Sequence, residues 1–105
     1  MGMTHLDIQP TAAALGRWGR ARRDFLKENR PQQYRSLAAS GRLILHCLQV
    51  EDAATQRLDW LIPQLAKTAG ATEQLKAADA MKWVGLMNAC RNQAEEIILE
   101  ELIYS

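Results

Sequence analysis

Apolar residues recur every three or four positions along most of the chain, which is the period of an α-helix with one buried face. The longest such stretch covers residues 72–104, which contain no proline and one glycine, Gly85. Thr72 is suited to cap the first turn, and Glu73 lies where the helix dipole favours a negative charge. The pattern predicts one long helix from 72 to 104, with an apolar cluster at its far end that needs cover on a second side.

Two helices are predicted in the first part of the chain. Residues 11–29 carry apolar side chains on one face, and this helix should end before Pro31, because proline biases the preceding residue away from helical angles. Pro31 suits the first position of a short second helix over residues 31–39. Gly41 then supplies the left-handed conformation that favours a helix end. Residues 1–10 show no sustained period, and we expect a flexible N-terminal arm there.

Apolar spacings of three and four over residues 42–67 predict a third helix. A division of this helix stays open, since Glu51 and Asp52 can cap a new one, and Pro63 should kink it. The short connector at residues 68–71 predicts an antiparallel hairpin of the third and fourth helices. The expected fold class is therefore all-α: a single-domain helical bundle of three to four helices over residues 11–105, with a long antiparallel C-terminal hairpin.

Composition agrees with one folded domain: 105 residues, of which 48% are hydrophobic and 24% charged. Cys47 and Cys90 lie in apolar surroundings, which predicts buried thiols in a reducing compartment rather than a disulfide. No apolar run approaches the roughly 20 residues of a membrane span, and the N-terminus lacks the pattern of a signal peptide. We expect a cytoplasmic protein with no membrane partner.

The overall charge of +1 conceals a separation of signs along the chain. The window from residue 17 to residue 42 carries eight basic and two acidic residues, a net charge of +6. From residue 51 to the end, five basic and nine acidic residues give −4. Such asymmetry favours a polyanionic partner for the first part of the chain.

Four basic residues of the predicted first helix share one stripe at spacings of three and four. They are Arg20, Arg23, Lys27 and Arg30. A DNA phosphate backbone would relieve their mutual repulsion, which makes them the candidate nucleic-acid-binding residues. The alternative, a solvated face neutralised by nearby carboxylates, stays open. A sequence-reading helix-turn-helix is disfavoured, because the apolar run over residues 43–50 leaves almost no polar face to enter a groove.

Catalytic and metal-binding patterns are weak. His46 and Cys47 are adjacent on a helix and so point about 100° apart, with no third group to orient them. Neither His46 nor His5 stands at metal-ligand spacing from a cysteine. Glu96 and Glu100 share a helix face, which is more typical of solvated carboxylates than of an acid/base pair. We therefore expect a protein that is not an enzyme and has no catalytic residue, cofactor, metal or small-molecule substrate.

A second apolar stripe, Met81, Leu99 and Ile103, lies behind the main apolar arc of the C-terminal helix. These are the candidate protein-interaction residues. Two kinds of cover stay open: the third helix of the same chain, or a protein partner, including a second copy in a homodimer.

The chain resembles the TnpV family of small proteins encoded within bacterial transposons. The resemblance spans about residues 16–104 and is most specific over residues 72–88. The residues that carry it are Trp18-Gly19, Phe25-Leu26-Lys27-Glu28, Arg30, Tyr34, Leu37, Ser40-Gly41, Leu43, Thr72-Glu73-Gln74-Leu75-Lys76-Ala77, Trp83-Val84, Met87-Asn88, Ala94, Glu96-Ile97 and Glu100. The chain departs from the family pattern at residues 50–52 and at Pro63.

The resemblance implies an association with mobile DNA and supplies no catalytic residues to carry over. The expected function is that of a non-enzymatic accessory protein of a bacterial mobile element, contacting DNA or another polyanion through its basic first helix. The alternative is a protein-binding module: an inhibitor of a host defence or nucleic-acid enzyme, or a self-associating helical adaptor.

Overall fold

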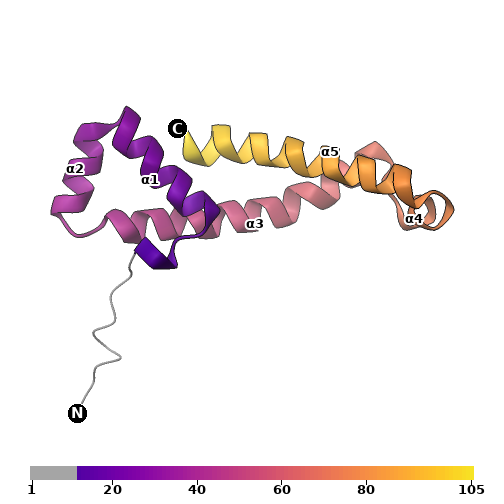
Figure 1. Ribbon diagram of the computed structural model, residues 1–105, viewed down its shortest axis with the longest axis horizontal. Helices are drawn as coiled ribbons and strands as arrows, with labels where there is room; N and C mark the ends of the chain where they lie inside the picture. Colours follow the sequence, from indigo (N-terminus) through magenta and orange to yellow (C-terminus); the bar gives the residue numbers. More distant parts are fainter. Residues whose placement is uncertain (1–11) are drawn as a thin grey trace, which may run out of the picture. The chain divides into compact units, whose positions relative to one another are not determined.

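The computed structural model describes residues 12–105, and the predicted arm over residues 1–10 lies outside them. The elements are a 3₁₀ turn (Ala12–Ala14), α1 (Arg17–Asn29), α2 (Pro31–Ala39), α3 (Leu43–Ala69), α4 (Glu73–Ala78), α5 (Ala80–Ile98) and a π-helical turn (Leu99–Ile103) (Figure 1). No strand occurs between residues 12 and 105, and the all-α class is confirmed. Two compact units divide within α3, between Asp52 and Ala53. The domain bounds 11–105 stay a prediction.

The first unit packs α1, α2 and the start of α3 around one small apolar core. Leu15, Leu26, Leu43 and Cys47 are buried at its centre. Four partly buried side chains surround them: Tyr34, Leu37, Ile44 and Leu48. The larger buried side chains of α1, those of Trp18, Arg22 and Leu26, are spaced by four and therefore share one narrow face of the helix. This face packs against the rest of the unit, while most of the charged residues of α1 lie on the other faces.

The connections on either side of α2 follow the prediction. α1 ends at Asn29, and Pro31 occupies the first turn of α2. Gly41 has φ of +73°, and the amide of Arg42 donates to the carbonyl of Leu37 at 2.9 Å. This geometry ends α2 and allows the chain to change direction within three residues. As a result, α2 runs across the direction of α3 (Figure 1).

Helix α3 is continuous over 27 residues. It passes through Glu51 and Pro63, so the division left open at Glu51 does not occur. Pro63 is exposed, while Leu61 and Ala66 on either side of it are buried. Packing of these neighbours offsets the hydrogen bond that proline cannot donate.

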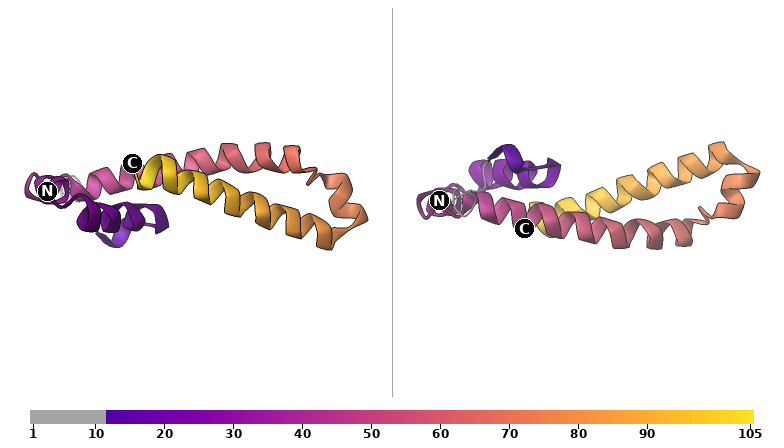
Figure 2. Two further views of the ribbon diagram at one scale, coloured as in Figure 1. Left: turned by 90° about the horizontal axis from the view of Figure 1, so that it is seen from above. Right: turned by 90° about the horizontal axis from the view of Figure 1, so that it is seen from below.

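The second unit is a helical hairpin, as predicted. The C-terminal part of α3 and α5 run antiparallel and diverge toward α4, which joins them (Figure 2). Thr72 caps α4 as expected, because its Oγ1 accepts the amide of Leu75 at 3.1 Å. At the other end, the Arg57 guanidinium bonds both carboxylate oxygens of Glu101, at 3.1 and 3.3 Å.

The prediction of one helix from 72 to 104 is wrong in two places. α4 ends at Ala78, and the carboxylate of Asp79 accepts the amide of Lys82 at 3.1 Å to begin α5. After Ile98 the helix widens into a π-turn, closed by the amide of Tyr104 on the carbonyl of Leu99 at 2.8 Å. Both departures change which side chains share a face. Between residues 12 and 105, none of the helices is long and apolar enough to cross a membrane.

Candidate nucleic-acid interface

The four predicted nucleic-acid-binding residues lie on α1 and at its C-terminal cap. Arg20, Lys27 and Arg30 are exposed, and Arg23 is half-buried. Arg20 Nη1 donates to the carbonyl of Leu15 at 2.6 Å, and Arg30 Nη1 donates to the carbonyl of Asn29 at 3.1 Å. The Arg30 guanidinium also lies 5.2 Å from the centre of the Phe25 ring.

These contacts orient the arginines without neutralising most of them. A backbone carbonyl carries no net charge, so Arg20 and Arg30 keep their full positive charge at the surface. Within the described residues 12–105, Arg23 alone of the four pairs with a carboxylate, that of Asp24 at 3.3 Å. An exposed pair between sequence neighbours is worth little and exchanges readily for another anion. The face of α1 therefore remains positive.

Arg22 is different, because it is buried with only 7% of its surface exposed. Its Nε donates to Nε2 of His46 at 3.2 Å, which assigns the imidazole proton to Nδ1. Burial lowers the pKa of His46 below its ordinary value of 6.5, and the charge of Arg22 lowers this pKa further. Arg22 therefore belongs to the core, and the basic surface has one residue fewer than the sequence count indicated. Its spacing of four from Trp18 and from Leu26 is the signal for this burial.

The N-terminus of α1 is held by a residue from α3. Gly16, at the cap position, offers no side chain, and Glu51 Oε1 instead accepts the amide of Gly19 at 2.8 Å. The carboxylate lies against the positive end of the helix dipole. This contact fixes the start of α1 on α3 and so sets the direction in which the basic residues of α1 face.

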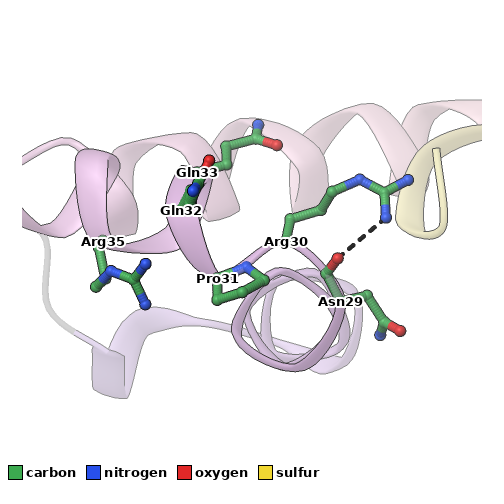
Figure 3. A pocket seen from close by; sticks show the side chains of 6 residues that line it. All are labelled: Asn29, Arg30, Pro31, Gln32, Gln33 and Arg35. Carbon is green, nitrogen blue, oxygen red and sulfur yellow. Dashed lines mark hydrogen bonds between the residues drawn. The ribbon is translucent and has the colours of Figure 1, made fainter.

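A pocket of about 470 Å³ opens where α1 passes into α2 (Figure 3). Its lining is mostly side chains that donate hydrogen bonds: Asn29, Arg30, Pro31, Gln32, Gln33 and Arg35. Figure 3 shows Arg30 and Arg35 on opposite sides of Pro31. Arg35 thus extends the basic surface of α1 onto α2. Arg35 lies outside the predicted stripe because the spacing pattern of that stripe belongs to a single helix.

A second, smaller hollow of about 250 Å³ lies between α2 and α3. Leu37 lines it from α2, Arg42 lines it from the connection just before α3, and three residues line it from α3: Leu45, His46 and Gln49. Leu45 is 46% exposed. The first turns of α3 therefore do have an outward face with polar side chains, contrary to what the apolar run over residues 43–50 suggested.

The predicted protein-interaction stripe is not continuous. Met81 is 82% exposed, Leu99 is half-buried and Ile103 is fully buried. The assignment of Ile103 to an interaction surface is therefore wrong, because its side chain is already covered within the single chain, which was one of the two kinds of cover left open. Met81 stays a predicted interaction residue.

Chemistry of other kinds has little support among residues 12–105. No group of three or more histidine, cysteine or acidic side chains there is close enough to hold a metal ion. Cys47 and Cys90 are both buried free thiols, and burial raises the pKa of Cys47 above its ordinary value. The buried position of Cys47 and its raised pKa suit it to packing rather than to nucleophilic attack.

Comparison with known proteins identifies a family over nearly the whole chain. The family model described as transposon-encoded protein TnpV matches residues 3–103. No curated protein and no solved structure gives a significant match. The chain belongs to the TnpV family of transposon-encoded proteins.

Proposed function

We propose that this protein is a non-enzymatic, cytoplasmic accessory protein of a bacterial mobile element, and that it contacts DNA through the basic face of α1. The observation that carries the proposal is the state of Arg20 and Arg30, which are exposed and, among residues 12–105, form hydrogen bonds to neutral carbonyls and no ion pair with a carboxylate. Of the eight basic residues between positions 17 and 42, six are exposed. Membership of a transposon-encoded family supplies the biological setting in which DNA is the available polyanion.

The physical basis is the release of counterions from DNA. Each cation that neutralises a phosphate frees condensed counterions, so the logarithm of affinity falls linearly with the logarithm of salt concentration. Four contacts, from Arg20, Arg23, Lys27 and Arg30, would give a slope of about −3.6. Such binding orients a protein on the duplex without selecting a sequence.

A titration of labelled duplex DNA between about 50 and 200 mM salt tests this function, because four contacts imply a loss of affinity of roughly 100-fold over that range. The double variant Arg20→Ala/Arg23→Ala should reduce the salt slope by about two. Lys67→Ala/Lys82→Ala is the matched control, since it removes the same charge from exposed positions of the second unit. Absence of binding at low salt, or equal effects of the two double variants, would rule out this function.

A second candidate function, protein binding, is favoured by the exposure of apolar side chains in the hairpin unit. Trp60 is 57% exposed, and Met81 and Val84 are exposed as well. No residue of α4, and none of α5 before Cys90, is buried. A hairpin of two helices leaves part of the apolar surface of each helix exposed, and in folded domains another helix or sheet normally packs on such a surface. A second copy of this chain is the occupant that we consider here, because it would supply an identical apolar surface.

A further inference from the structure

The outward face of α3 at its N-terminal end combines residues that suit base recognition. Leu45, His46 and Gln49 of α3 lie within one arc of the helix, and they line one hollow together with Arg42, which directly precedes α3. Leu43 and Cys47, on the opposite side, are buried in the core of the first unit. The packed face and the outward face are therefore distinct in these two turns, with the partly buried His46 at the border between them.

The connection between α2 and α3 presents this face. Gly41 at φ of +73°, with the amide of Arg42 on the carbonyl of Leu37, makes α2 run across the direction of α3 (Figure 1). In helix-turn-helix proteins the second helix enters the major groove with its N-terminal residues on base edges, while the first helix crosses the phosphate backbone. Arg35 on α2 and Arg30 before it are exposed cations that line one pocket, and they are candidates for contacts with phosphates beside the groove.

We propose that the first turns of α3 enter the major groove of duplex DNA, with Arg42 and Gln49 contacting base edges and Leu45 lying against a thymine methyl group. This inference rests on the proposed DNA-binding function and deepens it, because it adds sequence preference to phosphate contacts. It also places the groove-facing residues on a different helix from the basic stripe of α1.

The side chains fit the donors and acceptors of the groove. Arginine binds O6 and N7 of guanine with two parallel hydrogen bonds, and glutamine binds N6 and N7 of adenine in the same manner. The side chains of Arg42 and Gln49 are exposed and form no hydrogen bond or ion pair with any residue between 12 and 105. Arg42 and Gln49 can therefore bind base edges without losing a hydrogen bond to the described part of the protein. His46 differs from these two residues, because its Nε2 accepts a hydrogen bond from Arg22. Its ring therefore lies beside the proposed base contacts without making one.

Selection of tight binders from a library of random duplexes tests the inference with the full-length protein. We expect an enriched sequence that contains guanine and adenine. Gln49→Ala should reduce the preference for adenine at one position by about tenfold, and Arg42→Ala should do the same for guanine. Gln64→Ala is the matched control, because Gln64 is an exposed glutamine further along the same helix. Circular dichroism confirms that each variant keeps its helical content.

The outcomes separate the two proposals. Binding without any enriched sequence, or an enriched sequence that is the same in Gln49→Ala and Arg42→Ala as in the wild type, overturns base recognition by α3 and leaves binding by α1 intact. Absence of binding to any duplex at low salt overturns the proposed function and this inference together. Loss of preference in Gln49→Ala alone, with Gln64→Ala unchanged, supports it.

Discussion

Glu51 Oε1 lies 2.8 Å from the amide nitrogen of Gly19, and this hydrogen bond joins residues 32 positions apart. The carboxylate occupies the place that a serine or aspartate would take at the cap of α1, where Gly16 has no side chain. A residue of α3 thus performs a capping function for α1. This hydrogen bond, together with the buried residues of α1, holds the basic face in its orientation.

Replacement of Glu51 should destabilise the fold. Glu51→Ala removes the side chain that caps the Gly19 amide, and we expect a loss of about 1–2 kcal/mol in the free energy of unfolding. Glu100→Ala is the control, since Glu100 is an exposed glutamate and should change stability by less than about 0.5 kcal/mol. Urea unfolding followed by circular dichroism measures both. Equal stability of the two variants would show that the cap contributes nothing.

Two glycines in helices should respond in opposite directions to alanine. A Cβ at Gly19 would lie 3.0 Å from the backbone oxygen of Cys47, which belongs to a packed helix and cannot move freely. Gly19→Ala should therefore cost about 1–3 kcal/mol. A Cβ at Gly85 would meet nothing within 4 Å, so Gly85→Ala should stabilise the protein by about 0.5–1 kcal/mol. Thermal unfolding of the two variants and the wild type compares their stabilities. A more stable Gly19→Ala variant would contradict the close approach of α1 to α3.

Stability should depend on the protonation of His46. Because the pKa of His46 is lowered in the folded protein, its contribution is complete above the ordinary value of 6.5. As the pH falls below that value, the unfolded chain binds a proton that the folded chain resists, and stability is lost until the folded pKa is reached. His46→Gln keeps an acceptor for Arg22 and removes the titration. Urea unfolding at about pH 7.5 and about pH 5.5 should show a smaller loss in the variant; an equal loss in both proteins would refute this origin.

Self-association through the hairpin unit should be sensitive to charge at the exposed apolar positions. If a second copy covers Met81 and Val84, then Met81→Glu/Val84→Glu places charges in that interface and should convert a dimer into a monomer. Both residues are exposed in the single chain, so folding should be unaffected. Sedimentation velocity measures the mass of each protein. A wild type that is monomeric at about 100 μM would remove the second candidate function.

Much of the fold follows from local signals in the sequence. Pro31 and Gly41 define the bounds of α2, because proline constrains its neighbour and glycine alone adopts positive φ at no steric cost. The break at Asp79 was missed, since apolar periodicity continues across it. The signal that could have found it is the aspartate itself, which is a favoured cap and accepts the amide three residues later.

The candidate site was less accessible to sequence reasoning. Arg20, Arg23, Lys27 and Arg30 could be placed on α1 because a helical stripe depends only on spacing. The proposed contributions of Arg35 and Gln49 depend on how three helices pack. The role of Glu51 depends on a contact between residues far apart in the chain. A stripe can be drawn on one helix, whereas a surface formed by three requires their arrangement.

The most direct test of DNA binding by the first unit is a map of the contact. Backbone amide chemical shifts of the full-length protein, recorded during titration with a short duplex at low salt, report which residues meet DNA. We expect the largest changes over α1, α2 and the first two turns of α3, from Arg20 to Gln49, and small changes over α5. Changes confined to α5, or no changes at all, would contradict the account.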